Sequence, residues 1–203
     1  APDDAATAVA DIQSRPDVLA VEVDTPRQLT GRPKAAKLAA DPARGQQWAL
    51  DALKAESAWS SSTGAGVTVA VIDSGVAKHP DLAGSFVRGV DLIAGTDGRV
   101  DANGHGTHVA GTVAAVSNTI GVVGVLPNKQ LNLYIVKVFD ASGQAKSSTI
   151  VKGMLSCRKA GANVISMSLG SADSSKLEQL VVTFLAKRKV LLIAAAGNLG
   201  DTS

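Results

Sequence analysis

The sequence has 203 residues, enough for one domain with a sizeable core, and its formal net charge of +2 argues against nucleic-acid binding. No apolar run approaches the roughly 18 residues of a membrane span, and the start, APDDAATAVA, lacks the regions of a signal peptide. A hydrophobic content of 45% with 3% aromatic residues indicates an α/β interior built from Ala and Val. The single cysteine, Cys157, excludes an internal disulfide and is expected to be a buried small side chain.

The first 45 residues differ from the rest in composition and in the pattern of their apolar residues. A short helical pattern precedes Pro16, and residues 18–24, VLAVEVD, alternate apolar and other side chains as a strand with one buried face does. Residues 25–45 contain three prolines and five basic residues with little apolar periodicity. They predict an exposed linker that a protease can reach.

Short apolar runs separated by helical patterns begin at about Gln46. Because such runs are buried on both faces, they predict an α/β fold with a parallel sheet and helices on both faces. In these sheets the functional residues lie at the carboxyl ends of the strands. The predicted strands are residues 67–72, 133–139, 163–168 and 190–196.

Polar side chains follow two of these strands. Asp73 comes directly after VTVAVI, where a carboxylate is costly unless it is paired, and Asn198 follows VLLIAAA. Residues 102–115, ANGHGTHVAGTVAA, predict a helix start with Asn103 as the N-cap. This geometry places His105 on the first helical turn, near the carboxylate of Asp73.

Small residues give the same helix a flat face. Gly106, Ala110 and Ala114 recur every four positions and are expected to pack against the sheet. Gly104 and Gly106 allow other backbone to approach His105 closely.

Four segments, AVIDSGV, NGHGTHVAGTVAA, VISMSLG and AAAGN, together resemble the subtilisin-like serine peptidases, the subtilases. The resemblance covers residues 46–203 and implies Asp73 as the triad carboxylate, His105 as general base and Asn198 as oxyanion donor. The resemblance also implies the order along the chain, with the acid Asp73 before the base His105. Chemically, imidazole is a suitable base for a serine hydroxyl, and a carboxylate holds it in the required tautomer.

The resemblance also implies the substrate-binding residues. Ser168, Leu169 and Gly170 would form a strand lining the cleft. Gly143, Gln144 and Ala145, in DASGQAK, would form the opposite strand that pairs with the substrate backbone. The substrates implied are polypeptides.

The nucleophile of the family lies in a Gly-Thr-Ser-Met-Ala type motif downstream of the oxyanion asparagine, and residues 1–203 contain no such motif. We expect the serine to come from a C-terminal part of the same domain that follows Ser203. The chain alone is therefore expected to be inactive, with an open sheet edge where the later strands would pair.

The residues ADIQSRPDVLAVEVDTPRQL resemble the end of a subtilase propeptide, a small α+β domain that assists folding and inhibits the enzyme intramolecularly. The implied organisation is a propeptide remnant at 1–30, a processing linker at 31–45 and the N-terminal part of the catalytic domain at 46–203. A zymogen of this kind implies a secreted protein, with cleavage between Leu29 and Gln46.

A calcium site is implied as well. Asp81, in HPDL, and the loop VSNTIGV resemble the high-affinity site of the family. The ligands would be oxygen atoms, which suit Ca²⁺, and Gln46 or Gln47 could complete the set. They are the side chains of Asp81 and Asn118 and the carbonyls of Val116, Ile120 and Val122.

Two other classes of function stay open. His105 and His108 could chelate zinc in a metal-dependent hydrolase, although no glutamate lies suitably beside them. A subtilase fold without the nucleophile could merely bind peptides. Dinucleotide binding is disfavoured, because the sequence GAG at 64–66 precedes its strand instead of following it. We expect His108 to be buried and structural, and His79 to be a turn residue.

Overall fold

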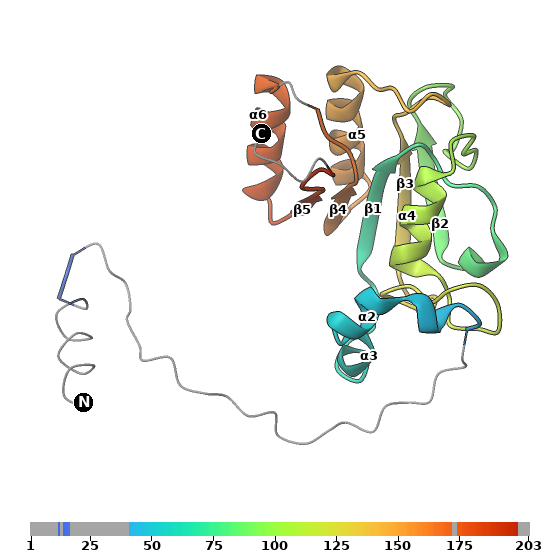
Figure 1. Cartoon of the computed structure of the whole chain (residues 1–203). Helices are drawn as coiled ribbons and strands as arrows, with labels where there is room; N and C mark the ends of the chain where they lie inside the picture. Colours follow the sequence, from blue (N-terminus) through green and yellow to red (C-terminus); the bar gives the residue numbers. More distant parts are fainter. Residues whose placement is uncertain (1–11, 13, 17–40, 172–173, 199–203) are drawn as a thin grey trace. The chain divides into compact units, whose positions relative to one another are not determined.

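The computed structural model describes residues 12, 14–16, 41–171 and 174–198. The chain divides into two units, residues 1–34 and 35–203, and the second contains the strands and helices discussed here (Figure 1). Within the described residues, no helix combines the length and the apolar character needed to cross a membrane.

The core of the second unit is a five-stranded sheet in which every neighbouring pair is parallel. The spatial order is β2-β3-β1-β4-β5, so β1 lies in the centre and the chain crosses it between β3 and β4. This confirms the predicted parallel α/β fold. The strands are β1 Thr68–Asp73, β2 Phe86–Asp91, β3 Asn132–Lys137, β4 Val164–Met167 and β5 Leu191–Ala194.

Helices cover both faces of this sheet (Figure 1). Helix α4, His105–Ala114, packs on one face of β1, whereas α5, Ser147–Lys159, and α6, Lys176–Ala186, lie on the other. The shorter elements are η1 Arg44–Gln46, α2 Trp48–Ala52, α3 Ala55–Ala58 and η2 Pro80–Leu82.

Alternate residues of β1 enter two separate hydrophobic clusters. Ala70 and Ile72 pack in the cluster that includes Met154 of α5, and Val71 packs with Ala110 of α4 on the opposite face. Burying a side chain such as Val or Ile contributes roughly 1.5–3 kcal/mol relative to leaving it exposed. Burial on both faces therefore explains why the sequence of β1 is a continuous apolar run.

Strand β2 was not predicted from the sequence. It is an edge strand with a register shift between Phe86 and Arg88. Arg88 is exposed and donates from Nη2 to the carbonyl of Ala160 at 2.8 Å, and Gly89 leaves no room for a Cβ beside the carbonyl of Ile135. An exposed arginine and a glycine interrupt the apolar pattern by which strands are recognised.

The opposite edge strand, β5, exposes apolar side chains. Leu191 is 56% exposed and Ile193 is 49% exposed. On α6, which packs next to it, Leu180 and Phe184 are also exposed. The sheet edge at β5 is thus uncovered in the described structure, as expected for an edge where another strand would pair.

The packed part of the second unit begins before Gln46. Asp41 is only 4% exposed, and the backbone N–H of Ala43 donates to the carbonyl of Gly121 at 3.0 Å, although both residues fall in the range predicted as linker. The predicted strand at 18–24 lies outside the described residues, as does most of the proposed propeptide. The domain boundaries therefore stay predictions.

Candidate active site

Asp73 ends the central strand β1 with its side chain 2% exposed. The backbone N–H of Ser74 donates to Oδ1 of Asp73 at 2.7 Å. The carbonyl of Asp73 continues the sheet by accepting the N–H of Val138 at 2.9 Å. The backbone N–H of Ser74 therefore holds the buried carboxylate at the carboxyl end of the sheet.

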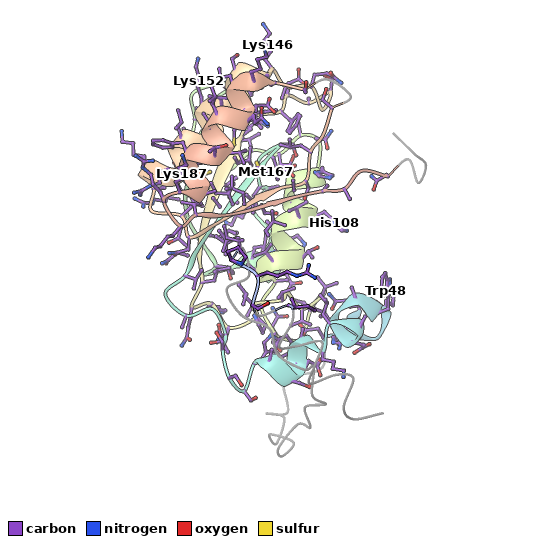
Figure 2. The ribbon with its side chains drawn as sticks, turned by 90° about the vertical axis from the view of Figure 1, so that its left-hand side faces the viewer. Trp48, His108, Lys146, Lys152, Met167 and Lys187 are labelled. Atoms are coloured by element: carbon purple, nitrogen blue, oxygen red, sulfur yellow. The ribbon has the colours of Figure 1, made fainter. Side chains whose placement is uncertain are left out.

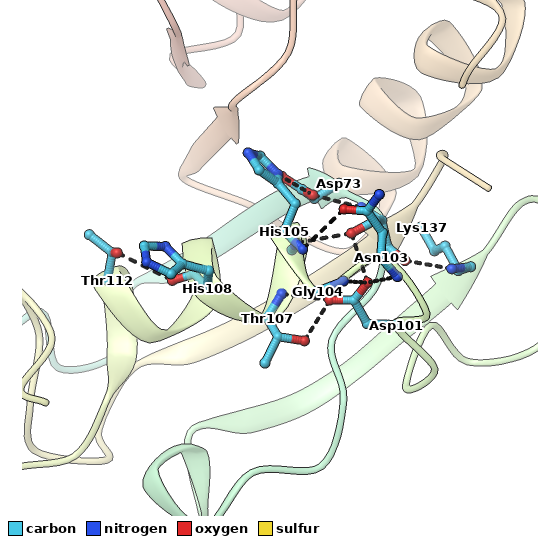
Figure 3. A network of polar contacts seen from close by, with 11 residues as sticks. Asp73, Asp101, Asn103, Gly104, His105, Thr107, His108, Thr112 and Lys137 are labelled. Carbon is cyan, nitrogen blue, oxygen red and sulfur yellow. Dashed lines mark hydrogen bonds and ion pairs between the residues drawn. The ribbon is translucent and has the colours of Figure 1, made fainter. Parts of the chain in front are cut away.

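His105 begins α4 and points its ring at this carboxylate (Figure 3). Its Nδ1 lies 2.8 Å from Oδ1 and 3.0 Å from Oδ2 of Asp73. The contact expected between the two residues is thus formed. With Nδ1–H donating to an ionised carboxylate, Nε2 is left as an acceptor. The His105 side chain is 53% exposed, so Nε2 belongs to an accessible imidazole.

The start of α4 differs from the prediction in one respect. Gly104, with φ +91°, is the N-cap residue, and not Asn103. The side chain of Asn103 accepts the N–H of His105 at 3.3 Å, a weaker version of the expected cap. The N–H groups of Gly104 and Thr107 donate instead to Asp101, at 2.9 Å each, a residue that sequence reasoning missed. An acidic residue just before a helix is the signal that could have found it.

The flat face of α4 is confirmed. Gly106, Ala110 and Ala114 are the buried residues of this helix. A Cβ on Gly106 would meet the carbonyl of Gly75 and the side chain of Asp73. The absence of a side chain at 106 therefore allows the imidazole and the carboxylate to come together.

A hollow of about 290 Å³ opens beside the pair Asp73 and His105. Most of the substrate-binding residues predicted from the resemblance lie at it, namely Ser168, Leu169, Gly170 and Gly143, together with Phe139, which was not predicted. Gln144 and Ala145 do not line it. Asp140 accepts the N–H of Gln144 at 3.0 Å, which folds this loop on itself.

Asn198 lies beyond β5, exposed and next to Gly197, whose φ is +90°. It does not line the hollow, and no hydrogen bond joins its side chain to Asp73 or His105 in the described structure. Residues 199–203 lie outside the described residues. The oxyanion role of Asn198 stays a prediction.

Lys137 is a buried cation close to this site that was also not predicted. It lies opposite Asp73 in the register of β1 and β3 and is 7% exposed. Its Nζ donates to the carbonyl of Ser74 at 2.5 Å (Figure 3). The sequence shows a lysine within the apolar run LYIVKVF. Its proximity to Asp73 and Ser74 could be recognised only from the fold.

The loop after α4 closes around Asp81, which is buried. Oδ1 of Asp81 accepts Nδ2 of Asn118 at 2.8 Å, and Oδ2 accepts the N–H of Val122 at 3.0 Å. Oδ1 of Asn118 accepts the N–H of Ile120 at 2.7 Å. The carbonyl of Asp81 accepts the N–H of Val116 at 2.8 Å. The five residues predicted as calcium ligands thus form one polar cluster.

A second buried carboxylate, Asp41, faces this loop and accepts the N–H of Asn118 at 3.0 Å. Neither Asp41 nor Asp81 has an ion-pair partner among the described residues. Two buried carboxylates at one loop fit a hard divalent cation, which would offset their charge. Gln47 does not fit as a ligand, because its side chain bonds both the N–H and the carbonyl of Val123.

The prediction that His108 is buried is wrong. Its side chain is exposed and points away from the sheet, on the same side of the molecule as the exposed Trp48 (Figure 2). Helix periodicity places it off the packed stripe, and in the described structure it lines a hollow that Trp48 of α2 also lines. His79 is a turn residue as expected, with Nδ1 accepting the N–H of Asp81 at 3.2 Å.

The zinc alternative has little geometric support. Nδ1 of His105 is engaged with Asp73, and the described residues contain no group of three or more His, Cys, Asp or Glu side chains that could hold a metal ion. Cys157 is buried as expected, and burial raises the pKa of its thiol to about 12.

A parallel sheet with an acid–imidazole pair at the end of its central strand defines an α/β protein with an acid–base site. The chain belongs to the subtilase family, since the Peptidase_S8 subtilase family matches residues 64–203. Subtilisin Savinase from Lederbergia lenta is 42% identical over 162 residues, which cover 79% of this chain and 59% of that protein. An alkaline protease from Alkalihalobacillus alcalophilus is 42% identical over 79% of this chain and 42% of its own.

A solved structure agrees with these relatives. The psychrophilic subtilisin-like protease Apa1 from Pseudoalteromonas sp. AS-11 matches with a TM-score of 0.64 and 42% identity, over 70% of this chain and 33% of that one. The chain spans about half the length of the curated relatives it matches.

Proposed function

We propose that this chain carries the acid and the base of a serine endopeptidase that hydrolyses peptide bonds by acyl transfer. The observation that carries the proposal is the distance of 2.8 Å between Nδ1 of His105 and Oδ1 of Asp73. Asp73 orients the imidazole, and Nε2 of His105 removes the proton of a serine hydroxyl as it attacks the scissile carbonyl. The names of the relatives, alkaline protease and subtilisin, support the same reaction.

The serine and the remaining strands are supplied by a part of the protein that follows Ser203. An extended peptide substrate lies between Ser168–Gly170 and Gly143–Ala145, and the amide of Asn198 donates to the developing oxyanion. The exposed Leu191 and Ile193 of edge strand β5 support a further partner segment there. Residues 1–30 act as an inhibitory propeptide of a secreted zymogen.

Calcium stabilises the protein through Asp81, Asn118 and the carbonyls of Val116, Ile120 and Val122, with Asp41 in place of the glutamine considered from the sequence. Bound there, the ion supplies positive charge that offsets two buried carboxylates. Its role in this proposal is structural, and no step of hydrolysis passes through it.

The test compares the 203-residue chain with the protein extended to the end of its reading frame. The extended protein should hydrolyse peptides and be labelled by a fluorophosphonate probe, and His105→Ala should remove both activities without unfolding it. The 203-residue chain should not be labelled. Labelling of the short chain would show that the nucleophile lies within it. Peptide binding without hydrolysis by the extended protein would favour a binding protein, and zinc-dependent hydrolysis insensitive to the probe would favour a metal-dependent hydrolase.

A further inference from the structure

Asp101 holds the loop that leads into α4 (Figure 3). Its Oδ1 accepts the N–H groups of Asn103 and Gly104 at 3.2 and 2.9 Å. Its Oδ2 accepts the N–H and the hydroxyl of Thr107 at 2.9 and 2.6 Å. Oδ1 also accepts the hydroxyl of Ser74 at 2.8 Å. Burial opposes the charge of Asp101, but these hydrogen bonds outweigh it and hold the pKa of its carboxyl below the ordinary value.

Ser74 connects this carboxylate to the end of β1. Its N–H donates to Asp73 at 2.7 Å, and its hydroxyl accepts the N–H of Gly106 at 2.9 Å while donating to Asp101. Its carbonyl accepts Nζ of Lys137 at 2.5 Å. Every polar atom of Ser74 is thus bonded, and the residue is buried. The strand end and the helix start are joined through one side chain.

The backbone is held on both sides of His105, while its ring is only loosely enclosed. Gly104 donates its N–H to Asp101, and Gly106 donates its N–H to Ser74. The His105 side chain is 53% exposed, so packing contributes little to its position. The distance from Nδ1 to the carboxylate of Asp73 therefore depends on where these bonds place the first turn of α4.

We propose that Asp101 is a positioning residue which, through Ser74 and the first turn of α4, fixes the imidazole of His105 against Asp73. Asp101 does not line the hollow beside the pair, so it acts without touching substrate. The inference rests on the proposed function of Asp73 and His105. A residue that merely capped the helix would stabilise α4 without controlling the contact between imidazole and carboxylate.

Proton NMR of the 203-residue chain reads this contact directly, because a hydrogen-bonded Nδ1–H of His105 gives a resonance far downfield of the amides. Its loss in Asp73→Asn assigns it. Asp101→Asn keeps the shape of the side chain but replaces an acceptor oxygen by a donor, and it should remove the resonance. The matched control is Asp97→Asn, an exposed carboxylate of the same segment that pairs with Arg99 and should leave the resonance in place.

A second pair of variants tests the same network more gently. Thr107→Val removes the hydroxyl that donates to Asp101, and Thr107→Ser keeps it. The valine variant should weaken the resonance and the serine variant should restore it. In the extended protein, Asp101→Asn should lower kcat by roughly 10- to 100-fold with KM changed by less than about twofold, because a misplaced base slows the chemistry and not the binding.

An unchanged resonance and an unchanged kcat in folded Asp101→Asn would overturn the inference and leave Asp101 as a helix cap. Should Asp101→Asn be unfolded by circular dichroism, equal spectra for Thr107→Val and Thr107→Ser would overturn it. A wild-type chain without the resonance would overturn both proposals, because there would be no contact to position. If the resonance depends on Asp101 but the extended wild-type protein hydrolyses no peptide, the positioning role stands and the proposed function fails.

Discussion

A Cβ atom on Gly106 would lie 2.1 Å from the carbonyl oxygen of Gly75 and 3.1 Å from Oδ1 of Asp73. Helix α4 therefore approaches the end of β1 more closely than a residue with a side chain allows. Gly106→Ala should lower the free energy of unfolding by about 1–3 kcal/mol, because backbone must move to admit the methyl group. It should also separate His105 from Asp73. Urea unfolding and the downfield Nδ1–H resonance measure the two effects.

The matched control for this variant lies five positions along the same helix. A Cβ on Gly111 meets nothing within 4 Å. Gly111→Ala should therefore keep the stability or raise it by up to about 1 kcal/mol, because alanine favours the helix. Equal stability of Gly106→Ala and wild type would contradict the close approach.

Asp91, at the end of β2, is buried and accepts the N–H groups of Ile93 and Ala94 at 2.8 and 2.9 Å and the hydroxyl of Thr96 at 2.9 Å. Burial opposes its ionisation, but these hydrogen bonds and the charge of Lys137 outweigh it and lower the pKa of Asp91. Because the folded pKa lies below the unfolded value, the stabilisation is complete above about pH 4–5 and is lost as the pH falls through the folded pKa.

Asp91→Asn should consequently destabilise the protein by about 1–3 kcal/mol at pH 7, and the difference from wild type should shrink in acid as Asp91 becomes protonated. Urea unfolding at pH 7, 5 and 3 measures this trend. Asp97→Asn is the control, since this exposed carboxylate pairs only at the surface and should change stability little. A difference for Asp91→Asn that stays constant with pH would refute the assignment.

Chelation of calcium should lower the melting temperature of the protein. Calcium at about 100 times its Kd adds about 2.7 kcal/mol if it binds only the folded state. Asp81→Asn and Asp41→Asn should each reduce the calcium-dependent shift, whereas Asp51→Asn, an exposed partner of Arg44, should keep it. Thermal melts with Ca²⁺ and with a chelator measure the shift. Identical wild-type melts in both conditions would refute the site.

Cys157 should resist thiol reagents while the protein is folded. Its side chain is fully buried, and burial raises its pKa to about 12. At pH 8 the thiolate would then be only about one in ten thousand molecules. Labelling by a chromogenic disulfide reagent should follow the unfolding curve in urea, with Cys157→Ala as the blank. Rapid labelling without denaturant would contradict this burial.

Strand positions could be predicted wherever a strand is buried on both faces. The run from Val69 to Ile72 has no polar residue, because α4 packs on one side and α5 on the other. Strand β2 could not be found in the same way, since Arg88 reaches the carbonyl of Ala160 from an edge position. An edge strand buries fewer of its side chains, so its sequence needs fewer apolar residues and shows a weaker apolar pattern.

Exposure on the helices was harder to predict than their position. His108 is exposed at a hollow that Trp48 of α2 also lines, and no local pattern around it could reveal that. The contacts of Asp41 and Asp101 were missed for a related reason. Asp41 contacts Asn118, 77 positions away, and Asp101 contacts Ser74, 27 positions away.

By itself the sequence determined the parallel α/β class and the glycine-rich start of the helix, because apolar runs and glycines are local signals. The pairing of Asp73 with His105 was predicted because a strand end and a helix start meet at one edge of the sheet, and because the four segments resemble the subtilases. Only the tertiary structure decided which other polar groups bond to the residues around that pair and which carboxylates face the loop after α4. Bonds such as Asp41 to Asn118 and Ser74 to Asp101 produce no repeating pattern in the sequence, because each depends on how separate elements pack in space.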